Sequence, residues 1–267
     1  MTWNSFIWFG MTSVACSAVA AVISACANDH WSVSSLRYRK LRSWSIALSS
    51  VAIAVLAAFI TGLWISLERP PLRTMGETRL WYSFFALVSG LFTYLRWRYR
   101  WILSFSTILS TVFIIINILK PEIHDQSLMP ALQSPWFIPH VTVYMFSYSL
   151  LGCAFLIAVA GLFNSKKKML SSADTLVYAG TAFLTFGMLS GALWAKEAWG
   201  DYWSWDPKET WAFATWLSYL LYLHLRPSCK NKDFLFAWLI FSFILLQMCW
   251  WGINFLPSAQ GVSIHTY

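Results

Sequence analysis

The segment TLVYAGTAFLTFGMLSGALWAKEAWGDYWSWDPKETWAFATWLSYLLYLHL, Thr175–Leu225, determines the fold class of this chain. It contains two apolar runs, Thr175–Trp194 and Pro207–Leu225, joined by a short loop rich in tryptophan. An apolar run of about 20 residues crosses a hydrocarbon core of about 30 Å as an α-helix. The segment therefore predicts two membrane-spanning helices with an aromatic loop between them.

The loop itself, WGDYWSWDPKETW (Trp199–Trp211), carries four tryptophans, a tyrosine and several charged side chains. A loop that only faces water has no ordinary need for so many flat aromatic rings. A loop that holds a large, flat, apolar cofactor does, because rings offer a broad contact area at low entropic cost. The loop is therefore the first candidate for a binding site.

The same alternation of apolar blocks and short polar connections runs through the whole chain. Of its 267 residues, 58% are hydrophobic and 11% are charged, whereas a soluble domain is about 25% charged. We therefore predict an all-α polytopic membrane protein, because lipid requires every backbone group to be satisfied internally. The eight predicted spans are Trp3–Ala25, Trp44–Ser66, Leu80–Leu95, Trp101–Leu119, His140–Phe163, Thr175–Trp194, Pro207–Leu225 and Phe234–Trp251.

The positions of the basic residues predict the orientation. Thirteen of the 19 basic residues fall in four alternate connections, around residues 37–42, 96–100, 166–168 and 226–232. Basic connections stay in the cytoplasm, so both termini and the tryptophan loop are expected on the non-cytoplasmic side. The net charge of +8 is spread over these clusters, which argues against nucleic-acid binding. The tryptophans expected to form an interfacial belt are Trp3, Trp44, Trp97, Trp101 and Trp238.

The remaining global features point to one domain spanning residues 1–267. Met1–Gly10 lacks a basic leader, so the first apolar block is expected to remain as a helix. No internal repeat is evident. The five cysteines form neither CxxC nor CxxCH, so no disulfide framework, zinc site or haem-attachment motif is expected.

The end of the tryptophan loop has the pattern of a helix start. Asp206 can serve as N-cap, Pro207 as the first helical residue and Glu209 as the third-position partner of a capping box. This purely structural interpretation is compatible with binding, since a rigid helix start would hold the preceding tryptophans in place. Lys208 could pair with an acidic group such as a cofactor carboxylate, or merely with Asp206.

Three of the five histidines are candidate ligands. His140 follows Trp136–Pro139 at the outer end of its span, and His265 lies near the C-terminus, also outside. His224 comes 17 residues after Pro207 on one helix, about 25 Å deeper and near the cytoplasmic side. An ionisable residue within a span is commonly functional, and histidine is a common axial ligand of haem iron.

Two interpretations of the external histidines remain open. His140 and His265 could form a bis-histidine haem site with the tryptophan loop as its floor. Alternatively, each is an interfacial residue with ordinary polar partners, as lone histidines at helix ends commonly are. His30 and His124 lie beside acidic residues in loops and are interpreted as solvated.

The segment Gly191–Arg226 resembles the tryptophan-rich "WWD" signature of haem-handling proteins. Within that group it is most similar to the CcsA (ResC) branch of system II cytochrome c biogenesis. The resemblance covers most of the chain from Arg69 onward. The supporting segments are RPPLRTMGETRLWYSFF (Arg69–Phe85), LMPALQSPWFIPHV (Leu128–Val141) and GINFLPSAQGVSIHTY (Gly252–Tyr267).

The resemblance implies a role for each candidate residue. His140 and His265 would ligate the iron of haem b, and His224 would ligate it at an inner site before the haem passes outward. Tyr202 departs from the tryptophan that many relatives carry. The resemblance suggests that a partner subunit supplies the second ligand for His224. The implied frame of the porphyrin, within the external loop at residues 194–211, is Trp199, Gly200, Tyr202, Trp203, Trp205 and Asp206.

The function that the resemblance implies is haem delivery and attachment during maturation of c-type cytochromes. The expected partners are a CcsB (ResB)-type membrane subunit, apocytochrome c with its CxxCH motif, and proteins of a thiol-reducing pathway. The chain would be a subunit of a cytochrome c synthase (haem lyase) complex rather than a complete enzyme. The expected location is the bacterial inner membrane or the thylakoid membrane, with the loop on the periplasmic or lumenal side.

Two other functions compete with this one. A haem transporter or chaperone without attachment activity would use the same tryptophan loop. A membrane cytochrome with two permanent b-type haems would instead place paired histidines on facing helices within the bilayer. Only His224 is clearly embedded by sequence, so the cytochrome interpretation is the weaker of the two.

Overall fold

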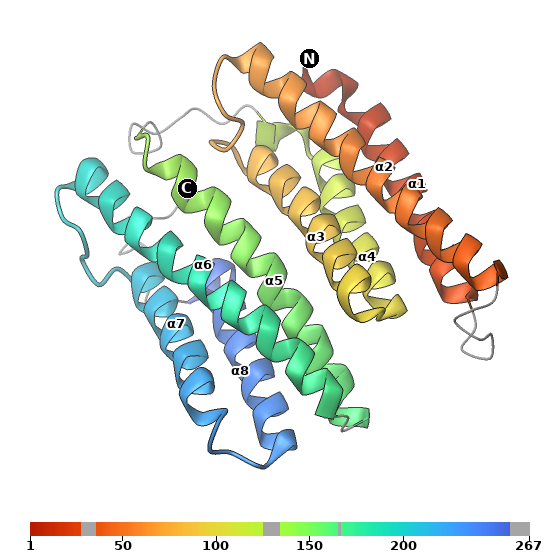
Figure 1. Cartoon of the computed structure of the whole chain (residues 1–267). Helices are drawn as coiled ribbons and strands as arrows, with labels where there is room; N and C mark the ends of the chain where they lie inside the picture. Colours follow the sequence, from red (N-terminus) through yellow and green to blue (C-terminus); the bar gives the residue numbers. More distant parts are fainter. Residues whose placement is uncertain (28–35, 125–133, 165–166, 257–267) are drawn as a thin grey trace. The chain divides into compact units, whose positions relative to one another are not determined.

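The computed structural model describes residues 1–27, 36–124, 134–164 and 167–256, and within these ranges it contains helices and no β-strand (Figure 1). The predicted all-α membrane fold is confirmed. The eight α-helices are α1 (Phe6–Cys26), α2 (Leu36–Leu67), α3 (Met75–Trp97), α4 (Arg100–Leu119), α5 (Phe137–Asn164), α6 (Lys167–Trp199), α7 (Pro207–Leu225) and α8 (Lys232–Trp250).

Each predicted span coincides largely with one of these helices, and most helices are longer than the span. Helices α2 and α6 have 32 and 33 residues, because helical hydrogen bonding continues into polar sequence that hydropathy excludes. Six of the helices described here are long and apolar enough to cross a membrane by composition. Helices α3 and α7 are outside that group, and both begin with a polar turn that contains a glutamate.

The chain divides into two compact units, Met1–Leu128 and Met129–Tyr267. In unit 1, α1 packs against α2 and α4, and α3 packs mainly against α4. In unit 2, α5 packs against α6 and α8, and α7 packs mainly against α8. Each unit is therefore a bundle of four helices that follow one another in the same cyclic order.

Small residues bring the helices of each unit close together. A Cβ added at Gly161 of α5 would lie 2.4 Å from the Phe236 ring of α8, and one at Gly180 of α6 would lie 2.6 Å from Leu151 of α5. In unit 1, Ser13 of α1 donates a hydrogen bond to the Ala52 carbonyl of α2 at 3.0 Å. Close backbone approach and buried hydroxyl bonds are the usual means of packing helices within a membrane.

The connection between the second and third helices is built alike in both units. It runs over residues 68–74 in unit 1 and residues 200–206 in unit 2, 132 positions apart. Each connection starts with a residue of positive φ, Glu68 or Gly200, and ends in the N-cap of a capping box. This correspondence was not evident from the sequence, because the side chains of the two connections differ.

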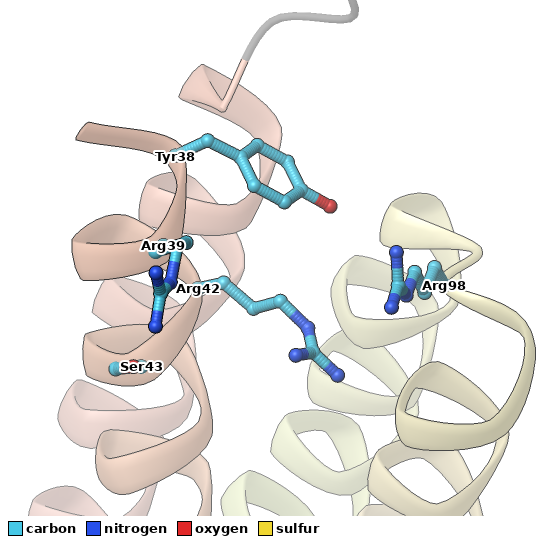
Figure 2. Close-up of a pocket in the computed structure, with 5 residues that line it drawn as sticks. All are labelled: Tyr38, Arg39, Arg42, Ser43 and Arg98. Atoms are coloured by element: carbon cyan, nitrogen blue, oxygen red, sulfur yellow. The ribbon is translucent and has the colours of Figure 1, made fainter. Parts of the chain in front are cut away.

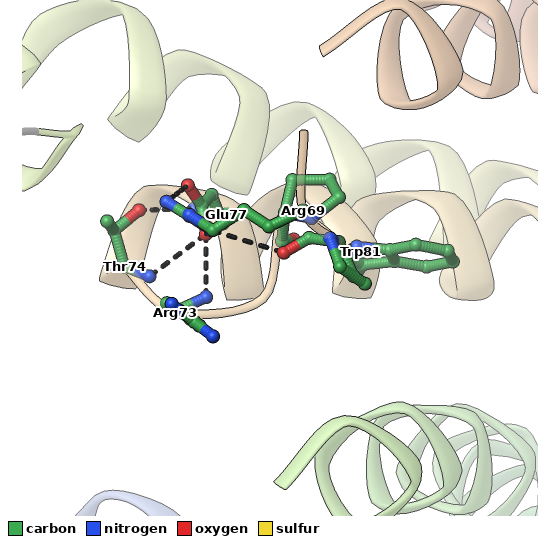
Figure 3. Close-up of polar contacts among 7 residues, drawn as sticks. Arg69, Arg73, Thr74, Glu77 and Trp81 are labelled. Atoms are coloured by element: carbon green, nitrogen blue, oxygen red, sulfur yellow. Dashed lines mark hydrogen bonds and ion pairs between the residues drawn. The ribbon is translucent and has the colours of Figure 1, made fainter. Parts of the chain in front are cut away.

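In unit 1 the connection is closed by a buried ion pair (Figure 3). The guanidinium of Arg69 donates two hydrogen bonds, at 2.9 and 3.0 Å, to the two carboxylate oxygens of Glu77. Glu77 is 1% exposed and also accepts from the backbone N–H groups of Arg73 and Thr74, at 2.6 and 3.1 Å. Trp81 donates from Nε1 to the Pro71 carbonyl at 2.8 Å. A buried carboxylate needs this many partners to offset its desolvation.

Candidate functional site

The tryptophan loop begins where α6 ends at Trp199. Gly200 has φ +93°, a conformation that suits glycine and ends helices readily. Lys196 of the last turn donates from Nζ to the Gly200 carbonyl at 2.5 Å and lies 5.3 Å from the centre of the Tyr202 ring. The lysine therefore ties the first part of the loop back to α6.

The loop ends in the predicted capping box, which is confirmed. Asp206 caps α7, and its Oδ1 accepts from the Lys208 N–H at 2.7 Å. One oxygen of Glu209 accepts from the Asp206 N–H at 3.1 Å and from the N–H and hydroxyl of Ser204 at 2.9 and 3.2 Å. Asp206 and Glu209 are both buried. The capping box thus fixes the backbone of the loop as well as the helix start.

Trp205, directly before the cap, has a backbone conformation that its side chain disfavours. Its φ is +58°, in the left-handed region that costs a non-glycine residue of order 1 kcal/mol. Its carbonyl accepts from the Thr210 hydroxyl at 3.2 Å, and its side chain is 62% exposed. The capping box therefore holds a large apolar ring outward at an energetic cost, which is a common property of binding sites.

An aromatic cluster continues from the loop onto α7. The rings of Trp203 and Trp205 meet edge to face at 5.9 Å, and each contacts Phe213. Phe213 stacks in turn near Trp216 at 5.8 Å. Trp216 is anchored to α6 because its Nε1 donates to the Thr185 hydroxyl at 2.8 Å. We call Trp203, Trp205, Phe213 and Trp216 the loop cluster.

His140 lies in the first turn of α5 against the glycine face of α6. Its Nδ1 is 2.8 Å from the Gly187 carbonyl oxygen. A Cβ at Gly191 would lie 2.6 Å from the same nitrogen, so the imidazole fits only because residue 191 has no side chain. The ring stacks on Trp194 at 5.4 Å, and the Tyr144 ring meets it edge-on at 4.6 Å. Four neighbours therefore fix the position of the imidazole.

The contact with Gly187 determines which nitrogen of the neutral His140 ring carries the proton. A carbonyl oxygen only accepts hydrogen bonds, so the neutral ring carries its proton on Nδ1. Nε2 then holds the lone pair, which is the state that a metal ligand requires. Metal-binding histidines in proteins commonly have this arrangement, with the other ring nitrogen bonded to a carbonyl or carboxylate.

Aromatic contacts link His140 to the tryptophan loop. Trp194, which is 2% exposed, stacks on His140 and meets Trp199 edge to face at 4.8 Å. A second set of contacts links α5 to the start of α7. Cys249 of α8 donates from Sγ to the Lys208 carbonyl at 3.6 Å and also hydrogen-bonds Tyr148 of α5. The structure therefore brings His140, Trp199 and the start of α7 into one region of unit 2.

His224 lies in the last turn of α7 with an exposed side chain. The neighbouring residues turn inward instead. Tyr222 donates from its hydroxyl to Asp174 of α6 at 2.5 Å, and Arg226 donates from Nε to both oxygens of the same carboxylate at 2.9 Å. Hydrogen bonding to Asp174 raises the pKa of Arg226. The end of α7 is thus fixed to α6 while His224 faces outward from unit 2.

The other three histidines have two different outcomes. His265 and His30 lie outside the described residues, so the His140–His265 pairing stays a prediction. His124, expected to be solvated, is half-buried, and its ring stacks on Trp3 with centroids 3.8 Å apart. That expectation was wrong because the neighbouring acidic residue suggested a solvent-facing loop, whereas the ring packs beside Gly76.

Sequence reasoning missed several residues that build the site. Gly187 and Gly191 form a small-xxx-small pair, a pattern that marks a helix-packing face and so could have placed the imidazole. Trp194 was predicted as the end of a span and the start of the external loop, but not as a contact of His140. Phe213 and Trp216 extend the aromatic surface along α7, and their spacing of three residues puts them on one helix face.

Comparison with known proteins shows to which family this chain belongs. A family model described as "Cytochrome C assembly protein" matches residues 72–259, from the connection before α3 to beyond α8. The chain belongs to the cytochrome c assembly protein family. Within this family, the cytochrome c biogenesis protein CcsA of Cuscuta exaltata is 35% identical over 254 residues, covering 78% of this chain and 81% of the relative. CcsA of Pelargonium hortorum is 31% identical over 271 residues, covering 81% and 84%.

A solved structure shares the fold of this cytochrome c assembly protein. The cytochrome c heme lyase CcmF aligns with a TM-score of 0.67 and 18% identity, over 93% of this chain and 46% of that chain. The chain therefore spans about half the length of CcmF, and at this identity the likeness concerns the fold alone. The predicted resemblance to the CcsA branch is confirmed, and with it a role in cytochrome c assembly.

Proposed function

We propose that this protein carries haem b to the non-cytoplasmic side of its membrane and presents it at the tryptophan loop for attachment to apocytochrome c. The geometry of His140 carries the proposal. Its imidazole is fixed by Gly187, Gly191, Trp194 and Tyr144 in the tautomer with the proton on Nδ1. Trp194 connects the ring to Trp199 at the start of the tryptophan loop. Family membership supports the same process.

The residues present fit a haem. An axial ligand needs a neutral imidazole with one nitrogen held by the protein and one available. A porphyrin face needs flat apolar contacts, and the exposed rings of Tyr202 and Trp205 offer them. We assign His265 as the second axial ligand. Trp199, Gly200, Tyr202, Trp203, Trp205 and Asp206 then frame the haem or hold the backbone that does so.

The proposed chemistry requires little acid–base work from this chain. Each thiol of the apocytochrome CxxCH motif adds its S–H across a haem vinyl group, which forms a thioether without an oxidant or a leaving group. The histidine of the motif then replaces one protein ligand on the iron. The protein contributes position, because holding both reactants in contact lowers the entropic part of the barrier. Reduced thiols are needed, so a thiol-reducing pathway works alongside.

The exposed position of His224 supports an entry role. Its side chain faces outward from α7, where a CcsB-type subunit or the lipid would meet it. We propose that haem is first bound there, with the second ligand supplied by that subunit. Both units together then form one haem-handling domain, residues 1–267, in a bacterial inner membrane or a thylakoid membrane, with the loop on the periplasmic or lumenal side.

The deciding test is maturation of a reporter apocytochrome that carries CxxCH, in a host lacking every other maturation system. This chain and a CcsB-type partner are expressed together, and covalent haem is measured by haem staining of denatured protein. We expect stained cytochrome only when both subunits are present. Haem that co-purifies with the complex, without any stained cytochrome, would identify a transporter or chaperone and contradict the attachment role.

Replacing Gly191 by alanine should displace the His140 ring. The new Cβ would lie 2.6 Å from Nδ1 and 2.7 Å from Cε1, so the ring must leave the Gly187 carbonyl. Losing a partner of a metal-binding histidine typically lowers metal affinity by about 10–100-fold. We expect a matching loss of haem per protein in the absorption spectrum of the purified complex.

The matched control for Gly191→Ala is Gly152→Ala, also within a helix of unit 2. A Cβ at Gly152 would have its nearest neighbour, Phe243, at 3.7 Å, an ordinary van der Waals contact. This variant should keep the haem content of the parent protein. If both variants retained haem equally, the fixed orientation of His140 would have no role in binding.

A further inference from the structure

A cavity of about 350 Å³ in unit 1 is lined almost entirely by cationic and hydroxyl side chains. Tyr38, Arg39, Arg42 and Ser43 come from the start of α2, and Arg98 comes from the end of α3. Figure 2 shows the Tyr38 ring and the Arg42 side chain extending from α2 toward the part of the chain that carries Arg98. We call these five residues the arginine pocket.

The two segments that carry the arginine pocket contain basic residues and no acidic ones. The segments 36–45 and 95–102 hold seven basic residues and neither aspartate nor glutamate. The Nε atom of Arg42 is buried and has no hydrogen-bond partner among the described residues. A buried donor on a charged group costs free energy unless it is satisfied, so this atom indicates an anionic ligand.

Arg98 has a backbone conformation that glycine would adopt with less strain. It is the C-cap of α3 with φ +61°, and its N–H donates to the Tyr94 carbonyl at 2.9 Å. Helices that end this way favour glycine at the left-handed position, because a Cβ is disfavoured there. An arginine at this strained position suggests that its side chain has a function in the pocket.

The arginine pocket lies where α2 changes from basic to apolar sequence. Arg42 comes two residues before Trp44, which is 62% exposed and starts the predicted span Trp44–Ser66. Trp97 lies next to Arg98, and the Arg96 guanidinium is 5.5 Å from the centre of its ring. Tryptophans beside arginines are typical of the headgroup level of a membrane, and of these two only Trp44 has a fully exposed side chain. This neighbourhood is the one expected at the depth of lipid phosphates.

We propose that the arginine pocket binds the phosphate of an anionic phospholipid on the side of the membrane that the basic connections face. Arginine forms charge-assisted, often bidentate hydrogen bonds with phosphate. Basic pockets between membrane helices on the cytoplasmic side are established sites for anionic headgroups. Binding there would link the start of α2 to the end of α3, the two elements that line the pocket.

The test compares three single variants of the full chain in nanodiscs of phosphatidylcholine alone or with phosphatidylglycerol. Arg42→Gln removes the buried donor, and Arg98→Gly removes a lining cation while relaxing the strained backbone. Lys40→Gln removes one exposed positive charge from α2 that does not line the pocket. Phosphatidylglycerol retained by the purified protein is counted by native mass spectrometry, and thermal unfolding is followed in both bilayers.

We expect the parent protein and Lys40→Gln to retain phosphatidylglycerol and to unfold at a higher temperature when it is present. Arg42→Gln and Arg98→Gly should bind it about tenfold more weakly, the effect of losing one charge-assisted hydrogen bond. Arg98→Gly should nevertheless fold at least as well in phosphatidylcholine, which separates ligand loss from misfolding.

Two results would overturn the proposal. If Lys40→Gln lost the lipid as completely as Arg42→Gln, general surface charge rather than the pocket would account for binding. If inorganic phosphate added to phosphatidylcholine nanodiscs gave the whole Arg42-dependent stabilisation, with no further gain from phosphatidylglycerol, the site would take a soluble phosphate compound and the lipid assignment would be wrong.

Discussion

Replacing His140 by alanine is expected to lower the yield of mature cytochrome c by about tenfold or more. Loss of the ligand should cost at least as much as loss of its hydrogen-bond partner, which is about 10–100-fold in metal affinity. The purified complex should also lose haem, or show the changed absorption of an iron with one ligand missing. Haem staining of the cytochrome and the spectrum of the complex are the two measurements.

Added imidazole separates ligand loss from structural damage in this variant. Alanine leaves a space between the Gly187 carbonyl and Trp194 that had held an imidazole ring, so free imidazole can occupy it. We expect partial recovery of both the spectrum and the maturation yield. Normal maturation by His140→Ala without imidazole would show that the external histidine is not a required ligand.

Replacing Glu209 by alanine is expected to disorder the tryptophan loop without touching His140. The carboxylate accepts three hydrogen bonds, two from Ser204 and one from the Asp206 N–H, and it is 8% exposed. Its loss should destabilise the start of α7 by about 2 kcal/mol, because buried donors are left unsatisfied. Trp205 would then leave its strained conformation, and haem content and cytochrome yield should both fall.

Two control variants identify why haem content and cytochrome yield decrease in Glu209→Ala. Glu209→Gln keeps an acceptor oxygen, and glutamine serves in natural capping boxes, so this variant should retain most haem. Glu77→Ala breaks the corresponding capping box of unit 1 and also removes the Arg69 ion pair, so it should lower stability at least as much. If Glu77→Ala lost as much haem per folded protein as Glu209→Ala, general instability rather than loop geometry would be the explanation.

The sequence predicted the parts of this protein that depend on local chemistry. Apolar runs predicted the helices, and the bounds of α7, Pro207–Leu225, agree with the prediction because Asp206, Pro207 and Glu209 are strong start signals. The signals are local because capping satisfies backbone groups within one turn. Hydropathy located α2 and α6 but predicted both as shorter than they are. It detects only the apolar residues that cross the membrane, whereas these helices continue into polar sequence.

Features that depend on contacts between helices could not be predicted in the same way. Nothing near His140 in sequence indicates that its partner is the carbonyl of Gly187, 47 residues away. The inward turn of Tyr222 and Arg226, which leaves His224 outside, depends on Asp174 of another helix. The arginine pocket was interpreted only as a topology signal, because a run of basic residues does not reveal that α2 and α3 meet there.

The matched connections after α2 and α6 have a consequence for how this protein can change over evolutionary time. Both use the same seven-residue frame, which starts at a residue of positive φ and ends at a capping box closed by a glutamate. The frame holds the Arg69–Glu77 ion pair in unit 1 and the tryptophans Trp203 and Trp205 in unit 2. Substitutions within one connection can therefore change its side chains while the backbone frame stays as it is.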